Sequence, residues 1–309
     1  MNKTVLIATT KPFSAGARAQ IEALLEEAGF SVKLLESYQE PSQLKEAIAD
    51  AAAVIIRSDI IDAEILDAAK ELRLVVRAGA GYDNVDLEAA RKRDVVVMNT
   101  PGQNANAVAE LVFGMMIYMA RGRFGGKPGT ELRGKTLGIH ALGNVGKAVL
   151  EVAKGFGMSV VAFDPFVDHD WVEAAGAIPV DTVEELYSRS NYVSLHVPAT
   201  AKTKGSIGKA LLERMPKGGT LINTARKEVI DEAGLLEALS ARPDLRYITD
   251  IAPSPATQAT LEAEHAAQVF ITPKKMGAQT SEANTNAGTA AARQIVAFLE
   301  HGERIHVVN

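Results

Sequence analysis

Residues 137–146 read Leu-Gly-Ile-His-Ala-Leu-Gly-Asn-Val-Gly, and a helical pattern begins at Lys147. The residues up to His140 are typical of a buried strand, and the glycines after them are typical of a tight turn. A strand, a glycine-rich turn and a helix start bring backbone N–H groups and the positive end of a helix dipole against a phosphate. This stretch therefore predicts a parallel α/β sheet with an anion-binding turn.

The turn follows the G-x-G-x-x-G spacing of dinucleotide-binding sites except at its first position, which is Ala141. In that pattern the first glycine makes the turn, and the other two allow close approach to the pyrophosphate and close helix packing. Gly143 and Gly146 keep these two positions, and we expect Ala141 to fit with a negative φ. Glycines that only pack a helix on a sheet are the alternative.

An acidic residue stands where the dinucleotide hypothesis requires one. Asp164 ends the next strand, about twenty residues after the turn, as expected for a carboxylate that binds the adenosine ribose. A 2'-phosphate would meet a negative charge there, so Asp164 favours NAD over NADP.

Short apolar runs alternate with amphipathic stretches on both sides of this motif, which is typical of parallel strands joined by helices. We therefore expect an α/β protein with two doubly wound parallel sheets, a Rossmann-type and a flavodoxin-like one. The first sheet would hold strands at 4–8, 31–35, 53–57, 74–77 and 95–99. The second would hold strands at 135–140, 159–163, 192–196, 219–223, 246–250 and 269–272.

The helices and loops between these strands indicate where the two domains divide. Ser14 can cap a first helix that Gly29 ends. An apolar helix at 107–121 and a loop at 122–134 with five glycines and one proline form a natural crossing point. The alanine-rich stretch 281–300 predicts a long helix that returns to the first domain.

Composition narrows the class of protein. The chain has 309 residues, 33 basic and 38 acidic side chains, and no cysteine. The net charge of -5 argues against nucleic-acid binding, and the missing cysteines exclude disulfides and thiolate metal sites. The start of the chain does not resemble a signal peptide, and no apolar run approaches the ~20 residues of a membrane span. We expect a soluble cytoplasmic protein that binds neither nucleic acid nor membranes.

Five further motifs carry a family resemblance: Arg-Ala-Gly-Ala-Gly-Tyr-Asp-Asn-Val-Asp at 77–86, Asn-Thr-Pro-Gly-Gln-Asn at 99–104, Ala-Glu-Leu at 109–111, Glu-Leu-Arg-Gly-Lys at 131–135 and Asn-Thr-Ala-Arg at 223–226. Together they resemble the D-2-hydroxyacid dehydrogenases, most of all short-form D-3-phosphoglycerate dehydrogenases without a regulatory domain. The resemblance covers essentially the whole chain.

The resemblance implies a discontinuous substrate domain, 1–101 with 283–309, and an NAD-binding Rossmann domain at 102–282. It also implies a homodimer formed through the nucleotide domain, although the connection at 121–132 is shorter than the family's usual arm. The implied cofactor contacts are Gly143, Asn144, Val145, Gly146, Asp164, His196, Val197, Pro198, Thr203, Thr224, Ala225, Asp250, Gly277 and Ala278.

Arg226 is the predicted substrate-orienting residue. It follows the strand at 219–223, at the carboxyl edge where open α/β sheets bind ligands. A guanidinium there can hold a carboxylate through two parallel hydrogen bonds and polarise the adjoining carbonyl, which is the role that the family gives its arginine. A surface arginine in a loop is the alternative.

The acid/base group departs from the family pattern. Lysine stands where the family's histidine would be, and Pro255 falls where its glutamate would be. Counting from Thr272-Pro273 selects Lys274, and counting back from Gly277 selects Lys275, which we favour. Desolvation and neighbouring cations would have to lower the lysine pKa toward ~7–8 for base catalysis. Otherwise the lysine only binds and polarises the substrate while water carries the proton, or both lysines are solvated loop residues.

A pair of arginines predicts an anionic substrate. Arg57 with Ser58 and Arg77 follow adjacent strands, where two guanidiniums can bind a phosphate and a carboxylate. Exposed amides at Gly79 and Ala80 could hold the substrate carboxylate, and Asn104 completes the predicted substrate contacts. Structural ion pairs are the alternative for both arginines.

The histidines give no sign of a metal. His140 fits a packed polar residue, and none of the histidines at 169, 265, 301 and 306 has ligand spacing. The resemblance implies NAD-dependent oxidation of D-3-phosphoglycerate to 3-phosphohydroxypyruvate, the first step of the phosphorylated route to serine, and the paired Arg57 and Arg77 favour this phosphorylated substrate. Two interpretations compete with this one: a glyoxylate or hydroxypyruvate reductase, and an NAD-sensing protein without catalysis.

Overall fold

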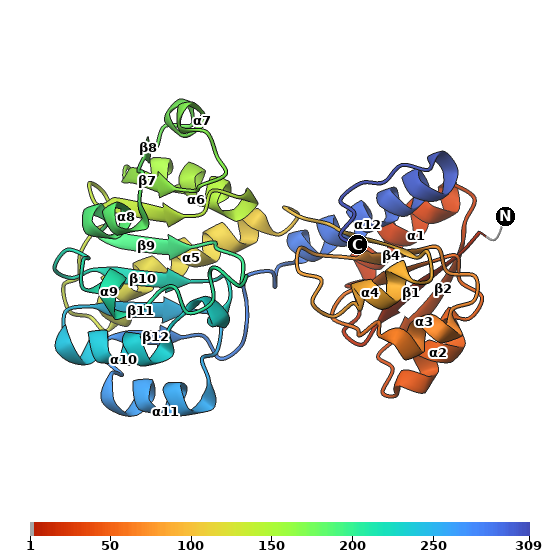
Figure 1. The fold of residues 1–309 in the computed structure, drawn as a ribbon, viewed down its shortest axis with the longest axis horizontal. Helices are drawn as coiled ribbons and strands as arrows, with labels where there is room; N and C mark the ends of the chain where they lie inside the picture. Colours follow the sequence, from red (N-terminus) through yellow and green to blue (C-terminus); the bar gives the residue numbers. More distant parts are fainter. Residues whose placement is uncertain (1–2) are drawn as a thin grey trace. The chain divides into compact units, whose positions relative to one another are not determined.

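The chain forms two compact units in a computed structural model that describes residues 3–309 (Figure 1). Unit 1 runs up to Asn104 and resumes over Gln279–Asn309, and unit 2 is Ala105–Ala278. The division predicted from the sequence, at 101/102 and 282/283, lies within a few residues of these bounds.

Unit 1 is built on a five-stranded sheet in which every strand is parallel to its neighbours, in the order β2-β1-β3-β4-β5. The chain order reverses between β1 and β3, as in flavodoxin-like sheets. The strands are β1 (Thr4–Thr9), β2 (Ser31–Glu36), β3 (Ala53–Ile56), β4 (Leu74–Arg77) and β5 (Val96–Asn99).

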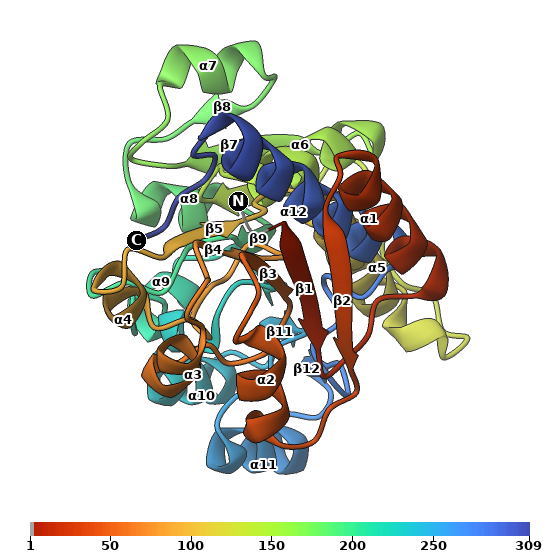
Figure 2. The ribbon, with the colours of Figure 1, turned by 90° about the vertical axis from the view of Figure 1, so that its right-hand side faces the viewer.

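Helices cover both faces of this sheet, as Figure 2 shows. One face packs against α1 and α12, and the other against α2, α3 and α4. Because both faces are covered, the inner strands β1, β3 and β4 read as apolar runs rather than as alternating patterns, whereas the edge strand β2 is mixed. The helices are α1 (Ala15–Glu27), α2 (Pro41–Ile48), α3 (Ala63–Ala68), α4 (Leu87–Arg91) and α12 (Ser281–His301).

The predicted first and last helices of unit 1 are both confirmed. The Ser14 hydroxyl accepts the N–H of Ala17 at the start of α1, and Gly29 follows its end with φ +76°. The last helix, α12, packs on α1 across Gly288, where a Cβ would lie 2.4 Å from the Ile21 side chain. A side chain at this position would force Ile21 to move, and the packing of α12 on α1 and the sheet places it in unit 1.

Unit 2 is built on a seven-stranded parallel sheet in the order β12-β11-β10-β9-β6-β7-β8, with a reversal between β6 and β9. This is the Rossmann order, extended by one strand. The strands are β6 (Thr136–His140), β7 (Ser159–Phe163), β8 (Ile178–Pro179), β9 (Tyr192–Leu195), β10 (Thr220–Asn223), β11 (Arg246–Thr249) and β12 (Val269–Ile271).

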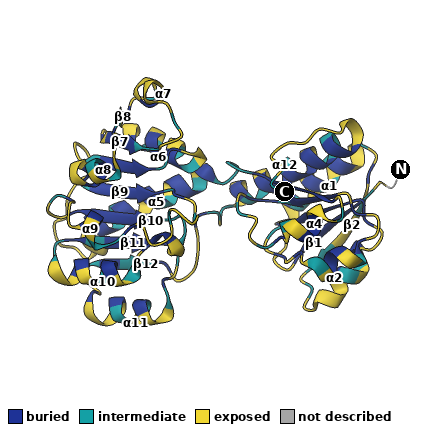
Figure 3. Ribbon diagram, viewed as in Figure 1, coloured by how far each residue is buried: buried dark blue, intermediate teal, exposed yellow. Residues whose placement is uncertain are grey.

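Two helical layers bury the central strands of unit 2, of which β9 and β10 are dark blue in Figure 3. One layer contains α5 (Ala105–Ala120), α6 (Asn144–Gly155) and α7 (His169–Ala174), with the short turn η1 (Gly122–Phe124) after α5. The other contains α8 (Val183–Arg189), α9 (Lys209–Leu212), α10 (Glu232–Ala241) and α11 (Pro255–Glu264), and η2 (Lys227–Val229) follows β10.

The predicted fold class is confirmed, with small differences at the strand ends. The two-residue strand β8 was not predicted, because two residues carry no periodicity. Strands β3, β9, β11 and β12 end one residue earlier than expected. Arg57, His196, Asp250 and Thr272 therefore lie just beyond strand ends, where side chains are available for ligands. No helix among the described residues has the length and hydropathy that a bilayer crossing needs.

Candidate active site

Each sheet has a switch point, defined here as the carboxyl edge between the two strands where chain order reverses. Ligands of open α/β sheets bind at such points. The switch point of unit 2 lies between β6 and β9, next to the glycine turn. That of unit 1 lies between β1 and β3, next to Arg57.

The glycine turn of unit 2 connects β6 to α6. Gly143 caps α6 with extended φ/ψ, and a Cβ at this residue would contact nothing within 4 Å. At Gly146 a Cβ would lie 2.4 Å from the Ala141 carbonyl oxygen, so a glycine is required there for the helix to pack on the turn. The first amides of α6, including those of Asn144 and Val145, have no acceptor within the helix and can donate to a bound anion.

The prediction of a negative φ at Ala141 is wrong. Its φ is +78°, in the region that glycine favours, and a residue with a Cβ loses roughly 1–2 kcal/mol there. Two hydrogen bonds hold the turn in this conformation. The Ala141 N–H donates to the Phe163 carbonyl at 2.9 Å, and the Leu142 N–H donates to Asp164 Oδ2 at 2.7 Å.

Asp164 follows β7 and faces the glycine turn. Its Oδ1 accepts the N–H of Phe166 at 2.9 Å, while Oδ2 accepts the N–H of Leu142. Each carboxylate oxygen has a second acceptor site, so the carboxylate stays able to accept ribose hydroxyls. Binding of the adenosine ribose by Asp164 stays a prediction.

Two histidines lie at the switch point of unit 2. The His140 ring is buried and packs edge-on against Phe163 and Tyr187, as expected for a packed polar residue. Burial lowers its pKa to about 4, although the Asp164 carboxylate acts in the opposite direction. Burial, with His140 nearby, lowers the pKa of His196 to about 3. Both imidazoles are therefore neutral at physiological pH.

The loop after β9 holds Val197, Pro198 and Thr203. Val197 is buried, whereas Pro198 is exposed. The Thr203 hydroxyl donates to the Pro198 carbonyl at 2.5 Å and accepts the Thr200 N–H at 2.8 Å. Thr203 thus shapes this loop through its own side chain, in addition to the predicted cofactor contact.

Arg226 lies in a turn that Asn223 holds. The buried Asn223 amide donates to the Arg226 carbonyl at 3.0 Å, and its Oδ1 accepts the Ala225 N–H at 3.0 Å. The Arg226 guanidinium donates to the Ala225 carbonyl at 2.9 Å. Thr224 contributes a buried hydroxyl that has no partner among the described residues. Sequence reasoning used Asn223 only as a family motif and missed its positioning role.

Asp250 connects the end of β11 to the loop of the two lysines. The carboxylate is buried, and its Oδ2 accepts the N–H groups of Met276 at 3.0 Å and Gly277 at 2.7 Å. Its Oδ1 is buried and has no hydrogen-bond partner among residues 3–309. Such an oxygen requires a donor from a ligand or from water, which fits the predicted cofactor contact.

Lys274 and Lys275 are both exposed. The Thr272 hydroxyl donates to the Lys274 carbonyl at 2.7 Å, so the loop is fixed on both sides of the lysine pair. Both roles predicted for the lysine, acid/base catalysis and substrate binding, stay predictions. Ala278 follows the loop and is partly buried.

At the switch point of unit 1, protein oxygens hold the Arg57 guanidinium. It donates to the carbonyls of Lys11 at 2.8 Å and Pro12 at 3.2 Å and to Asn284 Oδ1, and it lies 5.1 Å from the centre of the Phe13 ring. The acceptors of these hydrogen bonds are all neutral, and the alternative of a structural ion pair for Arg57 stays a prediction. Ser58, which follows it, is exposed.

Arg77 lies over the turn that follows β4. A Cβ at Gly79 would be 1.6 Å from its Nη1, so the guanidinium occupies space that only a glycine leaves open. The Gly79 φ of +145° also requires glycine. Asn99 holds the turn by donating to the Ala80 carbonyl at 2.6 Å. Asn104 is partly buried at the end of the first segment of unit 1.

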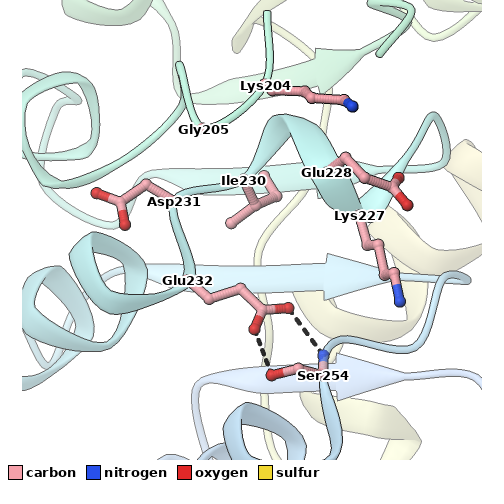
Figure 4. A pocket seen from close by; sticks show the side chains of 8 residues that line it. All are labelled: Lys204, Gly205, Lys227, Glu228, Ile230, Asp231, Glu232 and Ser254. Atoms are coloured by element: carbon pink, nitrogen blue, oxygen red, sulfur yellow. Dashed lines mark hydrogen bonds between the residues drawn. The ribbon is translucent and has the colours of Figure 1, made fainter.

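A pocket of about 680 Å³ lies on unit 2 beside the Arg226 turn (Figure 4). None of the predicted site residues lines it. Within it, Glu232 accepts hydrogen bonds from the Ser254 N–H at 2.8 Å and hydroxyl at 2.5 Å, and thereby holds the loop after Asp250. Among the described residues no group of three or more histidine, aspartate or glutamate side chains could hold a metal ion.

A family profile described as "D-isomer specific 2-hydroxyacid dehydrogenase, NAD binding domain" matches residues 107–274, which is more than half of the chain. The chain belongs to this family. The matched segment covers most of unit 2, so unit 2 is the NAD-binding domain of a D-2-hydroxyacid dehydrogenase. The orphaned Asp250 oxygen and the open space at Gly143 agree with this assignment.

Several relatives of the chain carry a more specific name. The chain is 34% identical over 305 residues to the D-3-phosphoglycerate dehydrogenase of Methanocaldococcus jannaschii, covering 90% of this chain and 57% of the relative. It is 37% identical over 262 residues to that of Archaeoglobus fulgidus, covering 79% and 49%. The chain thus spans about half the length of the curated relatives it matches.

Among solved structures, the fold is similar to that of an NAD+-bound 3-phosphoglycerate dehydrogenase from Entamoeba histolytica. The TM-score is 0.90, at 45% sequence identity, over 100% of this chain and 99% of that one. The similarity therefore extends over both units.

Proposed function

We propose that this chain is an NAD-dependent D-3-phosphoglycerate dehydrogenase, which interconverts D-3-phosphoglycerate and 3-phosphohydroxypyruvate. The observation that carries the proposal is the 45% identity, over nearly the full length of both chains, to the NAD+-bound 3-phosphoglycerate dehydrogenase. The half-buried Arg57 cation, held by neutral oxygens alone, supports the phosphorylated substrate.

Unit 2 supplies the cofactor-binding residues. NAD accepts the hydride when the hydroxy acid is oxidised. The amides of the glycine turn bind the pyrophosphate, the Asp164 carboxylate accepts the ribose hydroxyls, and the free Asp250 Oδ1 and Thr224 hydroxyl bind polar groups of the nicotinamide half.

Arg226 and the lysine loop act on the reacting end of the acid. The Arg226 guanidinium binds the carboxylate in two parallel hydrogen bonds and polarises the adjoining carbonyl. The ammonium of Lys275 donates a hydrogen bond to the oxygen at the reacting carbon, where negative charge develops during reduction. Proton transfer then occurs at that oxygen, either directly with the lysine or through water.

Unit 1 supplies the residues for the phosphate. Arg57 and Arg77 lie beyond the ends of adjacent strands, β3 and β4. The N–H groups of Gly79 and Ala80 donate to no acceptor within the described part of the chain and can bind a further anionic oxygen.

An NADH absorbance assay tests this function. We expect turnover of 3-phosphohydroxypyruvate and at least ten times lower kcat/KM with glyoxylate and hydroxypyruvate. A preference for either unphosphorylated acid would identify a different reductase, and NADH binding without turnover of any of the three would identify a binding protein. The lysine role fails if Lys274→Ala and Lys275→Ala both keep full turnover.

The family resemblance supports three further proposals. The substrate and nucleotide domains divide near residues 101 and 283, the protein is a cytoplasmic homodimer, and its product enters serine synthesis. Light scattering on the purified chain tests the dimer, since a monomer mass would contradict it.

A further inference from the structure

The last helix, α12, contributes a polar side chain to the switch point of unit 1. Asn284 lies in the first turn of α12, and its Oδ1 accepts a hydrogen bond from Arg57 Nη2. Its own amide donates to the Thr280 carbonyl at 2.7 Å, which fixes the orientation of the side chain. Asn284 was not among the residues predicted from the sequence.

Arg57 is held on three sides by groups that carry no charge. Nη1 donates to the carbonyls of Lys11 and Pro12, Nη2 donates to Asn284, and the Phe13 ring packs against the guanidinium. These bonds use three of the five N–H donors of an arginine and leave two for a ligand. The guanidinium is therefore oriented while part of its hydrogen-bonding capacity stays available.

No carboxylate among the described residues forms an ion pair with this guanidinium. Asp59 is the nearest acidic residue in sequence, and it accepts the Arg57 backbone N–H at 3.1 Å, the Thr10 N–H and the Tyr38 hydroxyl instead. Burial lowers the pKa of Arg57, and the Asp59 carboxylate acts in the opposite direction without bonding to the guanidinium. The charge of Arg57 is thus partly desolvated and has no ion-pair partner in the described part of the chain. Such a cation is stabilised when an anion binds.

We propose that Asn284 is a positioning residue for phosphate recognition: it fixes the direction of the Arg57 guanidinium without cancelling its charge. A carboxylate at this position would hold the arginine equally well but would compete with the phosphate. The inference rests on the proposed function, because it assigns a specificity role to a residue that does not itself bind the substrate.

Two alanine variants on the same helix test the proposal. Asn284→Ala should raise KM for 3-phosphohydroxypyruvate about tenfold and leave kcat, and KM for hydroxypyruvate, within about twofold of wild type. Asn286→Ala is the matched control, because Asn286 is exposed on α12 and its side chain forms no hydrogen bond with any of residues 3–309. Equal KM values in the two variants would overturn the proposal.

Asn284→Asp separates positioning from a structural role. The aspartate keeps an acceptor for Arg57. If Asn284 had a purely structural role, this variant should therefore regain the wild-type KM. Phosphate positioning predicts the opposite: KM for the phosphorylated acid should rise at least as much as in Asn284→Ala, because the added negative charge opposes the phosphate. A wild-type KM in Asn284→Asp would contradict the proposal.

A binding measurement keeps this test independent of the proposed activity. Inorganic phosphate should shift the Arg57 Nε–Hε NMR signal, assigned through its loss in Arg57→Lys, and Asn284→Ala should weaken phosphate binding several-fold. If wild type does not turn over 3-phosphohydroxypyruvate but shows these shifts, the proposed function fails and the Asn284 role stands. If phosphate does not shift the Arg57 signal, the Asn284 role fails, whichever substrate is used.

Discussion

The two switch points of this chain offer different groups to an anion. In unit 2 the glycine turn offers backbone amides at the start of α6. In unit 1 the charged side chain of Arg57 is held in place by carbonyls, an asparagine and an aromatic ring. The same topological rule thus places two sites, one made by the main chain and one by side chains.

This difference determines what each site tolerates. The backbone site depends on space, because a Cβ at Gly146 would collide with the Ala141 carbonyl. The side-chain site depends on charge, because Arg57 lacks a carboxylate partner in the described part of the chain. Substitutions that add volume should therefore weaken binding at the switch point of unit 2. Substitutions that add or remove charge should weaken binding at the switch point of unit 1.

The largest effect is expected at the reacting end of unit 2. Arg226→Lys keeps the charge but loses the two parallel hydrogen bonds, so kcat/KM should fall about 100-fold with phosphorylated and unphosphorylated acids alike. NADH affinity, measured by fluorescence titration, should stay within about twofold. Loss of activity with the phosphorylated acid alone would place Arg226 in phosphate recognition and contradict its assigned role.

A smaller loss is expected when volume is added to the glycine turn. Gly146→Ala should weaken NADH binding at least about tenfold, because the turn must move to accept a Cβ 2.4 Å from the Ala141 oxygen. Gly155→Ala is the control on the same helix, where a Cβ would meet nothing within 4 Å. Equal NADH affinities in these two variants would show that the turn is not the dinucleotide site.

Acid should destabilise unit 2 through its two histidines. Their pKa values in the fold, about 4 for His140 and about 3 for His196, lie below the ordinary 6.5, so the unfolded chain binds more protons between these values. The unfolding free energy should therefore fall as pH drops below 6.5, by up to about 1.4 kcal/mol per pH unit for each histidine.

Urea unfolding between pH 7 and pH 4.5 measures this slope. His140→Gln should make this slope shallower than in the wild-type chain. An unchanged slope in His140→Gln would contradict the assigned protonation. The comparison uses slopes, so a lower overall stability of the variant does not affect it.

The smallest effect concerns the strained alanine of the turn. Ala141→Gly should stabilise the chain by roughly 0.5–1 kcal/mol, because glycine accepts φ +78° without cost. The same substitution at Ala148, inside α6, should destabilise it by about 1 kcal/mol. Urea unfolding measures both, and a loss of stability in Ala141→Gly would contradict the strain.

Much of the fold could be predicted from local patterns. The apolar runs located the strands of both sheets except β8, and the Ser14 cap and Gly29 bounded the first helix, because these signals lie within a few residues of each other. The sign of φ at Ala141 could not be predicted, since it depends on hydrogen bonds to Phe163 and Asp164 on another strand.

The supporting residues of the candidate site were harder to find. Asn284 meets Arg57 across 227 positions of sequence, and only the return of α12 to unit 1 brings them together. Asp250 could be named from the family, but the contact of its Oδ2 with the lysine loop could not. Sequence patterns reveal ligand-facing residue types, whereas the residues that hold them in place are set by tertiary contacts.

The division of roles between the two switch points is tested most directly by steady-state kinetics of Arg57→Leu with 3-phosphohydroxypyruvate and hydroxypyruvate. We predict that wild type prefers the phosphorylated acid. In the variant the ratio of kcat/KM for the phosphorylated acid to kcat/KM for hydroxypyruvate should fall about 100-fold, while the NADH affinity does not change. A variant that keeps the preference, or that loses NADH affinity instead, would contradict the account.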